Sequence, residues 1–157
     1  MPTPTEIAEK FSRVDVHDDT IESFTFHPAP ERNARAKAKV TVTLFRQWTN
    51  THRILTLTDC RNIDFVVDAD VLKDNSPINT ALLEATADVD AIEAVMRKQK
   101  REWNVSYEKS IDPMPAKLTG AGRHVIFRVQ LFGGRLVVVA RSFNIKRLVS
   151  TETTSLR

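Results

Sequence analysis

The sequence lacks three features that assign chains to special classes of protein. Cys60 is the only cysteine among the 157 residues, so the chain cannot form an internal disulfide or a zinc site made of cysteines. No apolar run approaches the roughly 20 residues that a membrane-spanning helix requires. Residues 1–10 contain neither the basic nor the apolar region of a secretory signal. We therefore expect a protein of a reducing compartment, the cytoplasm, without membrane contact.

The sequence also lacks a strong charge of either sign. Its 23 Lys and Arg residues against 20 Asp and Glu residues leave a net charge of +3, so nucleic acid is not the expected partner. Hydrophobic residues make up 41% and charged residues 27%, which excludes a wholly disordered chain. This length suffices for one core, and the composition does not change along the chain. The sequence predicts a single domain over residues 1–157, with a frayed tail over residues 146–157.

Two segments have the pattern of amphipathic helices. Thr3 and Glu6 form a capping box with a proline between them, which predicts a helix over residues 4–13. A second helix is predicted over residues 91–103, with Asp90 at its start. Helical spacing gathers the apolar stripe of this second helix on one arc, formed by Ile92, Val95, Met96, Gln99 and Trp103.

Alternation of apolar and polar residues indicates several strands. In the first half of the chain it predicts strands over residues 20–27, 35–45, 54–57 and 63–67. Residues 78–87 fit either a helix or a strand, and the strand is favoured because Ile78, Thr80 and Leu82 alternate with other residues. Prolines and glycines predict an irregular loop over residues 110–123.

Residues 123–145 carry the strongest structural pattern, that of a β-hairpin. Two β-rich runs flank Gly133 and Gly134, which supply the positive φ angles of a two-residue turn. With Phe132 opposite Arg135, the predicted register puts four pairs on one core-facing side: Leu131–Leu136, Val129–Val138, Phe127–Ala140 and Val125–Ser142. These elements predict an α+β fold, in which an antiparallel curved sheet, or a small β-sandwich or barrel, is packed by the two helices.

The opposite face of this hairpin is the first candidate binding site. It mixes apolar with polar side chains, a composition between that of a core and that of an open surface. Its candidate contact residues are Ile126, Arg128, Val137, Val139, Arg141 and Phe143. We expect either a protein partner or a second copy of the chain on this face, or cover by another element of the same chain.

His17, Asp18 and Asp19 are the second candidate site. Adjacent His and Asp residues can ligate a metal, as in metal-dependent phosphohydrolases. The alternative, which we favour, is that one of the aspartates bonds turn amides while His17 packs over an edge. We therefore expect no catalytic residue, no bound metal and no cofactor, with a metal-dependent hydrolase as the alternative function.

The remaining motifs indicate structure more than chemistry. Residues 68–79 do not have the glycine and glutamate positions of a calcium-binding loop, and Gly120 and Gly122 do not open a helix as a dinucleotide-binding motif does. Cys60 has no feature of a nucleophile. Two basic faces are expected to be solvated; they comprise Arg35, Lys37 and Lys39 in one strand and Arg97, Lys98 and Arg101 in the second helix.

Two short motifs carry a resemblance to a known group of proteins. His17-Asp18-Asp19-x-Ile21 leads from a short helix into a strand, and Phe127-x-x-x-Leu131-Phe132-Gly133-Gly134-x-Leu136 spans the late hairpin. In both, the chain resembles a loose group of small bacterial β-rich domains, some of which are similar to polymorphic-toxin immunity proteins. The resemblance implies a non-catalytic binding domain. It names no partner.

Overall fold

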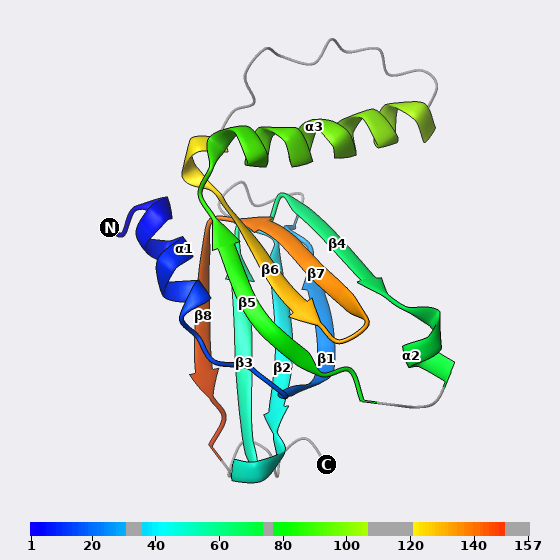
Figure 1. Ribbon diagram of the computed structural model, residues 1–157. Helices are drawn as coiled ribbons and strands as arrows, with labels where there is room; N and C mark the ends of the chain where they lie inside the picture. The colour runs from blue at the N-terminus through cyan, green and yellow to red at the C-terminus, as the bar shows by residue number, and fades with distance from the viewer. Residues whose placement is uncertain (31–35, 74–76, 107–120, 150–157) are drawn as a thin grey trace.

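The computed structural model describes residues 1–30, 36–73, 77–106 and 121–149 (Figure 1). These residues form mostly strands together with a few helices, which agrees with the predicted α+β class. The helices are α1 (Pro4–Ser12), α2 (Ala69–Lys73) and α3 (Val89–Ser106), with short 3-10 turns at Gln47–Thr49 and Ala121–Arg123. The strands are β1 (Thr20–His27), β2 (Lys39–Arg46), β3 (Thr51–Thr58), β4 (Asn62–Val67), β5 (Thr80–Thr86), β6 (Val125–Leu131), β7 (Gly134–Ala140) and β8 (Ser142–Arg147).

The strands form two four-stranded antiparallel sheets. One has the order β1-β2-β3-β8 and the other the order β4-β7-β6-β5. Inward side chains of both sheets belong to one core cluster, which includes Val42, Leu55, Phe127 and Val138. Each is at most 1% exposed, because the alternation that identified the strands also directs these residues to the same side.

Two pairs of strands pass from one sheet to the other at a shared corner. The chain bends at Asp59 between β3 and β4, where Asp59 has a φ of 58°, and again at Arg141 between β7 and β8. The amide of Arg141 donates to the carbonyl of Thr58 (2.9 Å), and the amide of Arg61 donates to the carbonyl of Val139 (2.7 Å). The two bends are therefore hydrogen-bonded to each other. At this corner, β3 of one sheet leads into β4 of the other, and β7 leads back into β8.

Helix α1 covers one end of the pair of sheets. It contacts β5 and β8, which are edge strands of different sheets (Figure 1). Phe11 is fully buried, with its ring centroid 4.8 Å from that of Phe127 and 5.0 Å from that of Phe143. The predicted capping box is present: the Thr3 hydroxyl accepts from the Glu6 amide and the Glu6 carboxylate accepts from the Thr3 amide.

Helix α3 lies over the outer face of the β4-β7-β6-β5 sheet and forms a second, smaller core with it. Ile92 of the helix and Ile126 and Val139 of the sheet are fully buried there, and Val95 and Met96 pack against them. The predicted helical face is thus confirmed at Ile92, Val95 and Met96. The helix begins two residues before the predicted start, with Asp88 preceding it and accepting a hydrogen bond from the Asp90 amide (3.1 Å).

Most predicted strands are confirmed within a few residues. Residues 20–27 form β1 as predicted, residues 80–86 are a strand, and the predicted strands over residues 54–57 and 63–67 lie inside β3 and β4. One prediction needs correction, since β2 begins only at Lys39; a short helix, α2, also follows β4. Strand β8 continues through Arg147, so the first residues of the predicted tail are paired with β3. Most of the predicted loop over residues 110–123 lies outside the described residues.

The predicted hairpin is present, but its register is wrong by two residues. Leu131 pairs with Gly134, and Val129 pairs with Leu136 instead of Val138. The turn is formed by Phe132 and Gly133, and of the two glycines only Gly133 has a positive φ, of 90°. Gly134 belongs to β7, where a β-carbon would overlap the carbonyl oxygen of Val66 in β4. A shift by two residues keeps each side chain on its face, so the predicted core face is confirmed from Val125 to Ala140. Ser142, predicted opposite Val125, instead pairs with Thr58 in the other sheet.

Candidate functional site

The predicted site at His17, Asp18 and Asp19 divides into an inner and an outer part. Asp19 is fully buried, and its two carboxylate oxygens accept hydrogen bonds from Arg46 Nε (2.8 Å) and from Arg53 Nη2. Both guanidinium groups also donate to the backbone carbonyl of Asp15, at 2.9 Å and 2.7 Å. Asp19 therefore holds together the loop before β1 and the adjoining ends of β2 and β3.

The backbone of the same loop is tied to the start of β5. The amide of Asp18 donates to the carbonyl of Thr80 (2.9 Å), and the amide of Thr80 donates to the carbonyl of Asp19 (2.8 Å). The buried hydroxyl of Thr80 donates to the carbonyl of Val16. These bonds hold Asp18 at a φ of 62°. The expectation that one of these aspartates bonds turn amides with its side chain differs from the observed contacts: the Asp19 carboxylate binds two guanidinium groups, and the amides of Asp18 and Asp19 donate to backbone carbonyls.

His17 and Asp18 point away from Asp19, toward solvent. Their side chains are 64% and 53% exposed, with His17 Nδ1 3.1 Å from Asp18 Oδ2. A cation bound at Asp19 would have to displace two guanidinium groups, which are themselves held by Asp15. No group of three or more His, Cys, Asp or Glu residues in the described parts of the chain has the geometry to hold a metal.

The predicted binding face of the hairpin is largely internal. Ile126 and Val139 are fully buried under α3, and Val137 packs against the same cluster. Arg128 is half-buried, and Arg141 is exposed at the corner between the sheets. Phe143, predicted on this outer face, lies in the main core against Phe11, because the chain changes sheet at Arg141. Helix α3 thus provides the cover that we considered as the alternative to a partner.

The corner between the sheets contains Cys60, the only cysteine of the sequence, and the buried residues Asp59 and His124. His124 is 3% exposed, and its Nε2 lies 3.9 Å from Asp59 Oδ2, while Arg61 Nε lies 3.5 Å from Asp59 Oδ1. Burial, together with the negative charge of Asp59, raises the pKa of the Cys60 thiol to about 11, although a hydrogen bond with the Val40 backbone opposes this. A thiol with so high a pKa is protonated at neutral pH and is a poor nucleophile.

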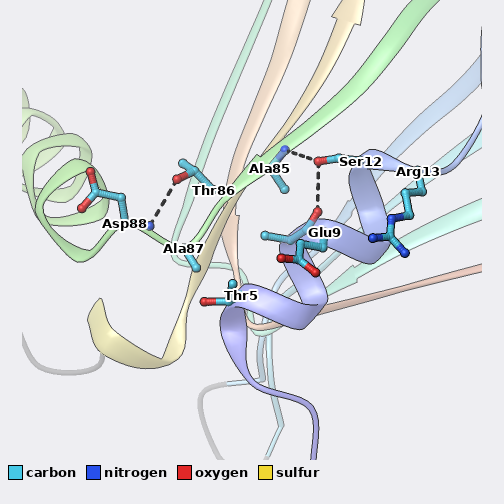
Figure 2. A pocket seen from close by; sticks show the side chains of 9 residues that line it. Thr5, Glu9, Ser12, Arg13, Ala85, Thr86, Ala87 and Asp88 are labelled. Atoms are coloured by element: carbon cyan, nitrogen blue, oxygen red, sulfur yellow. Dashed lines mark hydrogen bonds between the residues drawn. The ribbon is translucent and has the colours of Figure 1, made fainter.

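A shallow groove of about 630 Å³ lies between α1 and the end of β5 (Figure 2). Ser12 bridges its walls, since its hydroxyl donates to the Ala8 carbonyl and accepts from the Ala85 amide, both at 3.0 Å. Glu9 and Arg13 line the helix side. The groove is lined by side chains of both charges and by small side chains. Helix α1 already packs against part of the edge of β5.

The opposite end of the sheets, where β1 and β4 are the edge strands, has exposed aromatic side chains. Phe24 of β1 stacks on Phe65 of β4, with ring centroids 5.1 Å apart and ring planes at 4°. Phe26, Phe65 and Val66 are 49%, 39% and 44% exposed. We call Phe24, Phe26, Phe65 and Val66 the open edge.

The open edge was not predicted from the sequence. Phe24 and Phe26 have the alternation of core residues, and their partners in β2, Val42 and Val40, are indeed fully buried. Phe26 is exposed because β1 lies at the margin of its sheet, whereas Phe24 is half-buried and packs against the main core. The one local signal was the run Phe65-Val66-Val67, because consecutive apolar residues in a strand place one of them on each face.

The chain matches no protein-family model, no curated protein and no solved structure. Among the described residues, no helix combines the length and apolar character needed to cross a membrane.

Proposed function

We propose that this protein is a non-catalytic protein-binding domain and that the open edge is its contact surface. The observation that carries the proposal is the position of two aromatic-bearing edge strands, β1 and β4, side by side at one end of the molecule. Exposed apolar patches on a strand edge favour association, and aromatic side chains are enriched at the centres of protein interfaces.

Strand β4 pairs without a bulge and is open to another chain, whereas the pairing of β1 is irregular between Ile21 and Ser23. Lysine is missing from both β1 and β4, and their acidic residues are engaged: Glu22 with His52 Nε2 (3.2 Å) and Asp64 with Arg135 Nη2 (3.6 Å). A lysine or an inward-pointing charge is what commonly blocks such an edge. A partner strand can therefore approach the β4 backbone while its side chains cover Phe26 and Phe65.

The resemblance of the sequence to immunity-like domains favours a toxin protein as the partner. In this proposal the two sheets form a small β-sandwich, one end of which no described helix covers, and the chain acts in the cytoplasm. A second copy of the chain is the other protein that could cover the edge. The hydrolase alternative finds no support in the contacts, because Asp19 is engaged with two arginines.

The test has two steps: the genes beside that of this protein are searched for a toxin gene, and binding to the encoded toxin is measured by calorimetry. Phe26→Ser and Phe65→Ser should each weaken binding at least about tenfold, as expected for central interface residues. Leu82→Ser is the matched control, because Leu82 is 46% exposed on β5 at the opposite end. Sedimentation of the protein alone separates a toxin partner from a second copy. A monomer that binds no neighbouring toxin, or edge variants that bind like wild type, would overturn the proposal.

A further inference from the structure

A second groove gathers cationic and hydroxyl side chains on the outer face of the β1-β2-β3-β8 sheet. It has a volume of about 670 Å³. Thr41, Thr56 and Thr58 form part of its floor, with Lys37, Lys39 and His27 beside them. Pro28, Pro30 and Ala36 complete the lining.

The register of the strands explains why these side chains meet. Lys39 of β2 pairs with His27 of β1 on one side and with Thr58 of β3 on the other. Thr41 pairs in the same way with Thr56. Paired positions of an antiparallel sheet direct side chains to the same face about 4.5–5.5 Å apart. The ammonium, imidazole and hydroxyl groups therefore lie close enough together to contact one small anionic group and the atoms bonded to it.

The charged side chains among the described residues of the groove are of one sign. The described residues that line it include no carboxylate, and neither Lys37 nor Lys39 has a carboxylate partner in the described part of the chain. His27 Nε2 and Thr41 Oγ1 share a hydrogen bond of 3.1 Å, which fixes the two side chains relative to each other. In contrast, the groove beside α1 carries Glu9 and Arg13 together.

We propose that this groove binds a phosphate group. Lysine ammonium groups and threonine hydroxyls donate from several directions, which suits an anion with three or four oxygens. The described residues of the lining include no guanidinium fork, the group that best matches a planar carboxylate. The phosphate can belong to a small phosphorylated molecule or to the backbone of a single-stranded nucleic acid. The site shares no residue with the open edge, so either proposal can fail without the other.

Binding of two probes, inorganic pyrophosphate and a fluorescent single-stranded oligothymidine, tests the proposal and separates the two sources. The double variant Lys37→Glu/Lys39→Glu should lose binding of whichever probe the wild type binds, by at least about tenfold. The matched control is Lys10→Glu/Lys98→Glu, which makes the same change of charge on exposed residues of α1 and α3 and should bind nearly as wild type. Thermal unfolding of both variants checks that they fold.

A third variant tests the hydroxyl groups without changing the charge. Thr56→Val keeps the β-branched shape and should weaken binding about three- to tenfold, the effect of one hydrogen bond. For the oligonucleotide, the slope of log affinity against log salt should fall by about one to one and a half in the double lysine variant.

The outcomes are distinct. Pyrophosphate binding that the lysine variant abolishes supports a small phosphorylated ligand, and tighter, salt-dependent binding of the oligonucleotide supports a nucleic acid. Failure of both probes to bind overturns the proposal, as does an equal loss in the control variant. Preference for polyglutamate over both probes would show that the groove recognises acidic peptides instead.

Discussion

The two ends of the sheets differ in what covers their edge strands. At one end α1 packs across β5 and β8, and Phe11 fills the space between the sheets without any exposure. At the other end β1 and β4 meet through the Phe24–Phe65 stack, and Phe65 remains 39% exposed. Both ends use aromatic rings to join the sheets. Among the described residues, a helix covers only the α1 end, so the same type of contact contributes to stability there and is available for binding at the other end.

The largest expected effect is at the closed end. Phe11→Ala should lower the free energy of unfolding by about 3–5 kcal/mol, because it leaves a cavity beside Phe127 and Phe143. Urea denaturation followed by fluorescence measures the change. A loss below about 1 kcal/mol would show that α1 is not required to close this end.

The next largest effect is expected in the loop between α1 and β1, which connects the two ends of the pair of sheets. Asp19→Ala should cost about 2–4 kcal/mol, since it removes the carboxylate that both Arg46 and Arg53 bind. The guanidinium groups are 19% exposed, so water offsets part of the loss. Asp18→Ala is the control in the same denaturation series and should cost much less. Equal costs would mean that the buried ion pairs do not stabilise the loop.

A smaller effect is expected at the open edge. Phe65→Ala should cost about 1–2 kcal/mol, the worth of a partly exposed ring and one aromatic pair. The comparison with Phe11→Ala in one urea series sharpens the contrast between the ends. If both substitutions cost the same, the open edge is as much a part of the core as the closed end, and its availability for binding is in doubt.

The smallest effect concerns the start of α1. Hydrogen bonds from the Thr3 backbone, and then from the Thr3 hydroxyl, lower the pKa of Glu6 from its usual value. A carboxylate with a lowered pKa stabilises the folded state above its unfolded pKa, and this contribution is lost as the pH falls through the folded pKa. Glu6→Gln should therefore show a slightly smaller fall in melting temperature than wild type between about pH 6 and about pH 3. An identical fall in both proteins would exclude the contribution.

Local patterns predicted the parts of this fold that depend on neighbours in the chain. The capping box of Thr3 and Glu6 and the inward alternation of Val40, Val42 and Leu44 each arise within a few residues, so the sequence displays them directly. The hairpin register could not be predicted from the sequence in the same way, because either glycine could have supplied the positive φ of the turn. The close approach of Val66 to Gly134 decided it.

The candidate sites depended on contacts that the sequence does not display. Asp19 meets Arg46 and Arg53 from positions 27 and 34 residues away, and no local spacing marks that meeting. The open edge depends on the order of strands in two sheets, and the outer hairpin face depends on the path of α3. Alternation shows which side of a strand is apolar. It does not show whether a helix, a partner or water lies against that side.

The hydrogen-bonded corner at Thr58 and Arg141 has a consequence for how the molecule opens. Strands β3 and β8 belong to one sheet, and their direct continuations β4 and β7 belong to the other. Separating the two sheets would break the hydrogen bonds between the bend that joins β3 to β4 and the bend that joins β7 to β8. The amide protons of the two sheets should therefore become accessible to deuterium in a single concerted event, and the chain has no half that can persist as a folded fragment.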